Sequence, residues 1–159
     1  MIYNGKRIKM LKGESNMKEL RKFIYVLFLF FISCNTNTQV DKMEILKKAN
    51  DNYEKNYLKD ALELYNDYVK LDSTLGVAYF NKSHCEAMLF DYENSIKSLK
   101  KSIELNYRVV DANYNIARSY AATYNDSLAL YYFKEAYKLD STDMDIKEQI
   151  EIFTHRLNR

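Results

Sequence analysis

Apolar residues recur at steps of three and four along three segments of the chain, residues 58–71, 92–105 and 126–139. This spacing places the apolar side chains on one face of a helix, so each segment is predicted to be an amphipathic helix. In the first segment the apolar positions are Leu58, Ala61, Leu62, Tyr65, Tyr68, Val69 and Leu71.

The helical pattern is broken at 55–56, 90–91 and 125–126. Asp91 and Asp126 are predicted to be helix N-caps, because their carboxylates can accept the first free backbone N–H groups. Asn56 is predicted to take the left-handed conformation that a tight helical turn needs. Helices on both sides of each break give pairs of short antiparallel helices.

The chain aligns with itself without gaps when it is shifted by about 34 residues, which places position 61 on position 95 and position 95 on position 129. Small residues coincide at these three positions, and large apolar residues coincide four positions later. The tetrad Leu-Asp-Ser-Thr recurs two periods apart, at 71–74 and 139–142. Self-similarity at such a fixed period is typical of repeat architectures. The small residues at 49, 61, 83, 95, 117 and 129 are predicted to let paired helices approach closely.

A helical unit of about 34 residues, with a small residue opening its second helix and an aromatic or large residue four later, resembles the tetratricopeptide repeat. The resemblance implies an all-α protein, an α-solenoid with three repeats at 42–75, 76–109 and 110–143. The match is good in the second helices and patchier in the first ones, and the proline that usually follows the second helix is absent. Residues 144–159 carry one apolar stripe and are predicted to form a capping helix over the last repeat.

The resemblance also implies a concave groove, lined by the first helix of each repeat, that binds an extended peptide or a partner helix. The groove residues expected here are Leu46, Asn50, Tyr53, Phe80, Asn81, His84, Tyr114 and Arg118, with Met43, Val77, Ala87, Asp111 and Ala121 at further lining positions. Such a lining is apolar and aromatic with few charges.

Two special interpretations of the groove stay open. One branch of the family clamps a C-terminal carboxylate, and Asn50, Asn81 and Arg118 stand at three of its five positions, whereas Leu46 and Tyr114 replace the lysines. His84 is the groove residue that could titrate near neutral pH, although a polar residue without a special role explains it as well.

Ten unbroken apolar residues at 23–32 form a different kind of segment. A membrane-spanning helix needs about 20 such residues, whereas the core of a signal peptide needs roughly 7–15. A basic patch precedes the run, and Ser33-Cys34 and a polar stretch follow it. This order resembles a bacterial lipoprotein signal peptide over 17–33, which implies a lipid, such as palmitate, on Cys34. Phe31 departs from the usual leucine of the lipobox.

Residues 34–41 are then a polar linker, and residues 1–16 are interpreted as a mis-assigned upstream extension, with Met17 as the true start. An uncleaved N-terminal anchor helix is the alternative. Both interpretations place the rest of the chain outside the cytoplasm.

Composition narrows the function classes. Of three glycines only Gly76 lies beyond position 13, so a glycine-rich phosphate loop is excluded. Two cysteines and two histidines cannot build a cysteine-based zinc site, and no cofactor is expected. Residues 1–33 carry 7 basic and 2 acidic residues, which leaves 17 basic and 20 acidic residues, a net charge of −3, for residues 34–159. Nucleic-acid binding is therefore not expected.

These observations predict a non-catalytic lipoprotein of the bacterial cell envelope, lipid-anchored at the outer membrane and facing the periplasm. Its groove would bind a protein or peptide partner, with no small-molecule substrate and no metal. The alternative is a fixed structural subunit of an outer-membrane assembly or secretion complex. An enzyme on a helical scaffold is a third hypothesis, without a spacing that ties candidate catalytic residues together.

Overall fold

The computed structural model describes residues 17, 20–26 and 41–159. The chain divides into two units, residues 1–41 and 42–159. In the first unit, residues 20–26 are helical, and Cys34 and most of the linker lie outside the described residues. Within the described residues, no helix has both the length and the apolar character needed to cross a membrane.

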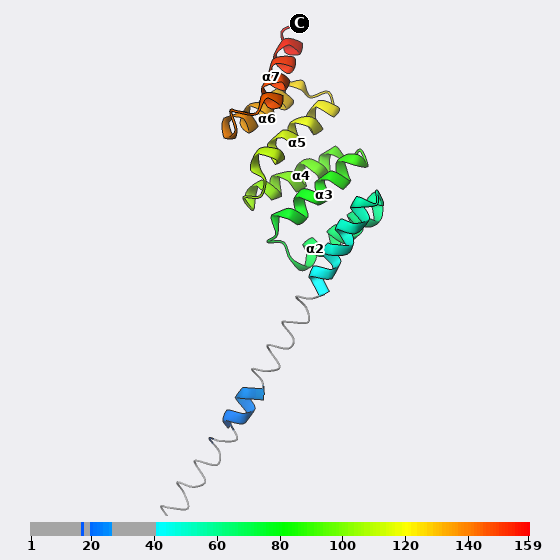
Figure 1. The fold of residues 1–159 in the computed structure, drawn as a ribbon, viewed down its shortest axis with the longest axis vertical. Helices are drawn as coiled ribbons and strands as arrows, with labels where there is room; N and C mark the ends of the chain where they lie inside the picture. The colour runs from blue at the N-terminus through cyan, green and yellow to red at the C-terminus, as the bar shows by residue number, and fades with distance from the viewer. Residues whose placement is uncertain (1–16, 18–19, 27–40) are drawn as a thin grey trace, which may run out of the picture. The chain divides into compact units, whose positions relative to one another are not determined.

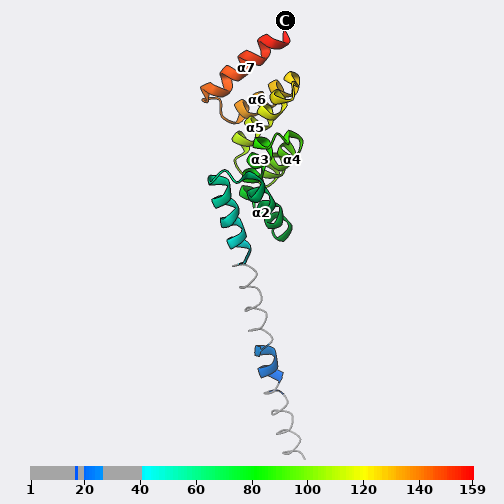
Figure 2. The ribbon, with the colours of Figure 1, turned by 90° about the vertical axis from the view of Figure 1, so that its right-hand side faces the viewer.

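The second unit is a stack of helices. A helix that ends at residue 54 is followed by α2 (Leu58–Leu71), α3 (Gly76–Met88), α4 (Tyr92–Glu104), α5 (Val109–Ala122), α6 (Asp126–Leu139) and α7 (Met144–Leu157). Each labelled helix packs on the next one along the chain, as Figures 1 and 2 show. The part of the chain that the structure describes contains no strand. The predicted all-α solenoid, with α7 as its last helix, is confirmed.

The three turns between the paired helices share one backbone geometry. Asn56, Phe90 and Tyr124 stand one repeat apart and have φ values of 61°, 64° and 59°. Each donates its backbone N–H to the carbonyl three residues earlier, at 2.9–3.1 Å. In each turn the next residue donates to a carbonyl five residues earlier, as in a Schellman motif. The left-handed conformation predicted for Asn56 is confirmed, and the period of the sequence repeat extends to the backbone.

One of the two N-cap predictions is confirmed and the other is wrong. Asp91 caps α4, where its carboxylate accepts the Asn94 N–H at 3.3 Å. The prediction for Asp126 is wrong, because Asn125 caps α6 and accepts the Leu128 N–H at 3.3 Å. Asp126 is instead the first residue of α6, and its carboxylate binds Arg156 Nε at 3.1 Å, which ties α6 to α7.

The core follows the predicted small positions. The residues at 49, 61, 83, 95, 117 and 129 are all almost fully buried. Larger side chains fill the space beside them, among them Tyr65, Leu99 and Phe133, the apolar positions four residues into the second helices. Close helix approach at small residues therefore builds each pair, as the sequence predicts.

Replacing Tyr124 by glycine is expected to raise the free energy of unfolding by about 0.5–1 kcal/mol. Left-handed backbone costs an L-residue ~1–2 kcal/mol, and the larger backbone entropy of unfolded glycine offsets part of the gain. The Tyr124 side chain is 88% exposed, so little packing is lost. Urea unfolding followed by circular dichroism measures the change. The control is Tyr131→Gly, at an exposed position inside α6, which should lower stability by about 1 kcal/mol. A Tyr124→Gly protein less stable than wild type would contradict the strain argument.

The two Leu-Asp-Ser-Thr tetrads form the same turn. Asp72 accepts Thr74 N–H at 3.0 Å and Thr74 Oγ1–H at 2.6 Å, and Asp140 makes the same two bonds with Thr142 at 3.0 and 2.7 Å. Asp72 also accepts a hydrogen bond from Lys42 Nζ at 2.9 Å, and this bond links the helix that ends at residue 54 to the end of α2. The Thr74 hydroxyl, with Lys42 and the Thr74 amide, lowers the pKa of Asp72 from 3.8 to about 2.

Asp72→Asn is expected to cost about 1 kcal/mol at pH 7, because it weakens bonds to a charged, partly buried carboxylate. The folded pKa lies below the unfolded one, so this stability is present above about pH 3.8. It is lost as the pH falls through about 2, where wild type and variant should converge. Asp140→Asn is the matched control, since no lysine that the structure describes binds Asp140, and it should cost less. Equal losses from both variants in urea titrations would show that the Lys42 link contributes nothing.

Candidate functional site

A hollow of about 500 Å³ opens along the ends of three consecutive first helices. The side chains come from the helix ending at 54, from α3 and from α5, with two more from the start of α4. The lining residues are Tyr53, Ser83, His84, Ala87, Met88, Tyr92, Ser95, Asn115, Arg118, Ser119 and Ala122. The first helices of the repeats therefore form most of the wall of the hollow.

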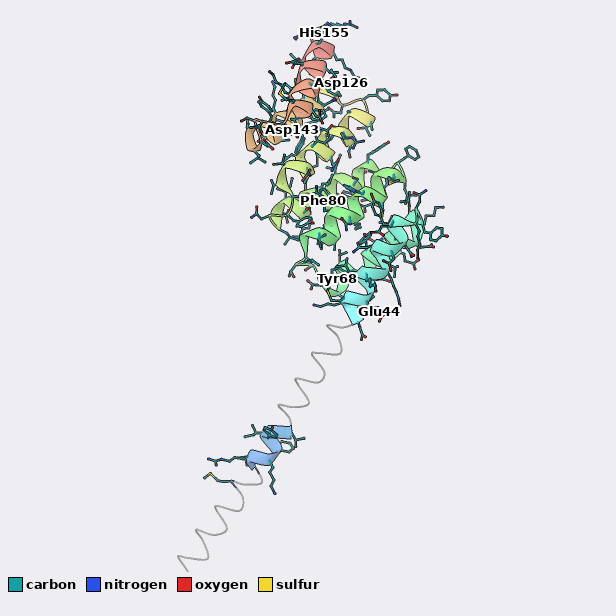
Figure 3. All side chains as sticks on the ribbon, viewed as in Figure 1. Glu44, Tyr68, Phe80, Asp126, Asp143 and His155 are labelled. Carbon is teal, nitrogen blue, oxygen red and sulfur yellow. The ribbon has the colours of Figure 1, made fainter. Side chains whose placement is uncertain are left out.

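The eight predicted groove residues do not all reach this hollow. Tyr53, His84 and Arg118 line it together. Leu46 and Phe80 are only 7% and 2% exposed, and both belong to the core. Their assignment to the groove surface is corrected, because the small residues draw the helices close enough to bury them. Phe80 lies within the stack on α3 (Figure 3).

Tyr114 and the two asparagines are occupied within the fold. The Tyr114 ring packs edge-on against Phe133, with centroids 5.3 Å apart. Asn50 Oδ1 accepts both the Tyr65 hydroxyl at 2.6 Å and Asn81 Nδ2 at 3.1 Å. Two of the three residues that resembled the carboxylate clamp thus bond to each other, and Arg118 is the one that faces the hollow.

His84 lines the hollow, and both of its ring nitrogens contact neighbouring side chains. Its Nδ1 lies 3.4 Å from Tyr53 Oη, and its Nε2 lies 3.4 Å from Asn115 Nδ2. An amide nitrogen can only donate, so Nε2 accepts and Nδ1 carries the proton that points to Tyr53. In this arrangement the neutral imidazole is protonated at Nδ1.

The surroundings favour the same neutral state. Burial lowers the pKa of His84, and the nearby Arg108 and Arg118 cations lower it further, against a smaller opposing effect of Asp111. The Phe80 ring packs beside the imidazole with centroids 4.7 Å apart. The guanidinium of Arg108 lies over the Phe80 ring, 4.8 Å from the ring centroid, and Arg108 Nε donates to the carboxylate of Asp111 at 2.9 Å. At neutral pH, His84 therefore serves the hollow as a polar, uncharged wall.

Arg118 is the charged residue of the hollow. Its side chain is exposed, and it makes no ion pair with any residue that the structure describes. No carboxylate is among the residues that line the hollow. In a unit with a net negative charge, this leaves a local positive site beside apolar and aromatic walls.

Sequence reasoning missed several lining residues. Asn115 could have been found, since it stands one repeat period after Asn81. Met88 and Ala122, also one period apart, follow the predicted lining positions 87 and 121 by one residue. Tyr92 belongs to the second helix of its repeat, so a pattern based on first helices could not have found it.

The described residues offer neither a metal site nor a reactive thiol. No group of three or more His, Cys, Asp or Glu residues that could hold a metal occurs among residues 17, 20–26 and 41–159. Cys85 is buried, and burial raises the pKa of its thiol to about 11. It therefore behaves as a small apolar core residue.

No family model and no curated protein matches the chain. The stack does resemble solved structures. A crystal structure of MamA has a TM-score of 0.70 at 20% identity, over 74% of this chain and 68% of that one. The first TPR of Spaghetti (RPAP3), bound to the HSP90 peptide SRMEEVD, has a TM-score of 0.68 at 13% identity, over 74% of this chain and 94% of that one.

A third similar structure is the Yersinia enterocolitica type III secretion chaperone SycD in complex with a peptide of the translocator YopD. Its TM-score is 0.67 at 12% identity, over 72% of this chain and 92% of that one. The fold is a tetratricopeptide-repeat solenoid. In this fold the hollow lies where helices of neighbouring TPR units meet, between the second and third repeats, with Tyr53 added from the first.

Proposed function

We propose that the chain is a non-catalytic, lipid-anchored envelope protein whose TPR groove binds a segment of a partner protein. The observation that carries the binding role is the hollow around His84, with apolar and aromatic walls and with Arg118, which pairs with no carboxylate that the structure describes. A concave, mostly apolar site with a few convergent polar groups is the usual form of a binding site. Two structures of the same fold hold peptides, of HSP90 and of YopD.

The non-catalytic role is supported by the chemistry of the hollow. It has no carboxylate in its lining, its imidazole is fixed between Tyr53 and Asn115, and the nearby thiol is buried. A general base or nucleophile needs a mobile or activated group within reach of a substrate.

Site-specific photo-cross-linking tests the binding role. A photoreactive amino acid at Ala87, in the wall of the hollow, should give a defined cross-linked product in cells that express the full chain. The same group at Lys147, exposed on α7, is the control and should not give this product. Arg118→Glu should abolish the Ala87 product. A product that persists in the Arg118→Glu protein would contradict the assignment of the hollow as the docking site.

The envelope location rests on the signal pattern over 17–33, of which the structure describes only residues 17 and 20–26, and on Cys34, which lies outside the described residues. We propose that Cys34 carries a lipid that anchors the protein at the outer membrane, with the TPR unit in the periplasm. Cys34→Ala, or treatment with globomycin, should block maturation, so that a longer precursor that keeps residues 17–33 accumulates. Unchanged processing and anchoring in either case would overturn this part of the proposal. Labelling with radioactive palmitate provides the direct readout.

A further inference from the structure

A second hollow, of about 360 Å³, lies next to the first one. Its lining comes from α4 and the end of α5 and consists of Tyr92, Glu93, Ile96, Lys97, Lys100, Tyr120 and Thr123. Tyr92 lines both hollows. Along α5 the residues alternate, since Ser119 and Ala122 face the first hollow and Tyr120 and Thr123 face the second. Neighbouring residues of a helix point about 100° apart, so the two hollows lie on adjacent faces of α5, and Tyr92 of α4 marks the seam between them.

Two exposed aromatic side chains neighbour residues that line the hollows. Phe90 is 79% exposed and packs edge-on against Tyr92, with ring centroids 6.3 Å apart. Tyr124 is 88% exposed and directly follows Thr123 of the second hollow. Both residues have left-handed backbone, which is strained for an aromatic residue. Neither side chain is buried in the core, so the fold gains little from either.

Both hollows carry a positive charge. Arg118 in the first hollow and Lys100 in the second form no ion pair with any residue in the described ranges. The one carboxylate among the lining residues, Glu93, is bound to Lys97 Nζ at 2.7 Å. Each hollow therefore presents, beside aromatic walls, one cation that no described carboxylate neutralises.

We infer that the partner segment does not end in the first hollow but crosses the seam over Tyr92 and continues into the second hollow. The inference rests on the proposed binding function of the first hollow. The segment is extended, acidic and aromatic. Its carboxylates pair with Arg118 on one side and with Lys100 on the other, and its rings pack against Phe90 and Tyr124. The strained turns thus serve recognition at the expense of stability.

The probe for this chemistry is a fluorescein-labelled random copolymer of glutamate and tyrosine, with a copolymer of lysine and tyrosine as its counterpart. Binding to the purified full chain is measured by fluorescence anisotropy. We expect the acidic copolymer to bind at least about tenfold more tightly than the basic one. Arg118→Glu and Lys100→Glu should each weaken its binding about tenfold, and Tyr124→Gly about fivefold. Lys134→Glu is the control, because it makes the same charge change at an exposed position of α6. Its affinity for the acidic copolymer should stay within about twofold of wild type.

The outcomes separate this inference from the proposed function. If Arg118→Glu weakens binding but Lys100→Glu and Tyr124→Gly do not, the segment ends in the first hollow and the inference is overturned, whereas the proposed function stands. If neither copolymer binds, or if the basic one binds equally well, the acidic segment is overturned, and cross-linking from Ala87 still tests the first hollow. If the Tyr124→Gly protein loses binding to phosphatidylglycerol vesicles, or loses a dimer seen by sedimentation, a membrane or a second copy occupies the seam instead.

Discussion

Replacing Gly76 by alanine is expected to lower the free energy of unfolding by about 2 kcal/mol, the middle of the range for an overpacked core position. A Cβ at this position would lie 2.4 Å from Tyr107 Cβ and 3.3 Å from Leu105 Cβ. Both atoms are attached directly to the backbone between α4 and α5, so that turn must move to make room. Such overpacking costs ~1–3 kcal/mol, and the reduced entropy of the unfolded chain returns less than about 1 kcal/mol. Equilibrium urea unfolding, followed by circular dichroism, measures the loss.

Two further variants test the cause of that loss. Val110→Ala changes the residue at the same position of the next repeat and should cost less than about 1.5 kcal/mol. Tyr107→Ala removes a ring that packs against Phe80 but keeps the Cβ that causes the contact. Gly76→Ala should therefore be as costly in the Tyr107→Ala protein as in wild type. A marked rescue there would place the conflict at the ring instead of the backbone.

The close approach of Gly76 to Tyr107 is a detail that the sequence could not predict, whereas the fold itself could be predicted. The self-alignment, the helical spacing and the small residues are local patterns, and each is visible directly in the sequence. Residues such as Ala61 and Ala129 are buried because each repeat reproduces the same local contact. Gly76 is different, since its reason for being glycine lies in Tyr107, near the opposite end of the same repeat. A sequence pattern contains no signal for such an approach.

The site shows the same division. Tyr53, His84 and Arg118 are predictable because the family's groove positions repeat with the helices, and they do line one hollow. Leu46 and Phe80 share a different groove position, the fifth residue of their repeats, and both are buried there. The family pattern assigns that position to the groove surface, whereas in this stack it belongs to the core. The sequence misplaces the cap of α6 by one residue because Asn125 and Asp126 are both good caps. Asn125 caps the helix, and the carboxylate of Asp126 binds Arg156 instead.

The buried carboxylate of Glu86 is a second position where the loss of one atom, a single hydroxyl oxygen, should lower the stability of the fold. Glu86 is 3% exposed, at the end of α3, and its Oε2 accepts the Ser98 hydroxyl at 2.7 Å. Lys82 Nζ lies 3.4 Å from Oε1. Burial raises the pKa of Glu86, and the bonds from Ser98 and Lys82 only partly oppose that effect. The charged form is therefore tolerated because these two donors satisfy it.

Ser98→Ala is expected to cost about 2 kcal/mol at pH 7, since it leaves a buried carboxylate oxygen without its donor. Ser83→Ala is the matched control. Ser83 is equally buried, but its hydroxyl donates only to Phe80 O within its own helix, so its loss should cost less than about 1 kcal/mol.

The pH dependence distinguishes a burial penalty from lost packing. The folded pKa of Glu86 lies above the unfolded one, so the native state binds the proton first. The contribution of Glu86 to the free energy of unfolding therefore rises as the pH falls through the folded pKa and levels off below the unfolded value of 4.5. Glu86→Gln should remove this rise, and Ser98→Ala should steepen it because the charged form has lost a donor. Parallel stability curves for wild type and Ser98→Ala between neutral pH and pH 4.5 would show that the serine fills space and does not stabilise the charge.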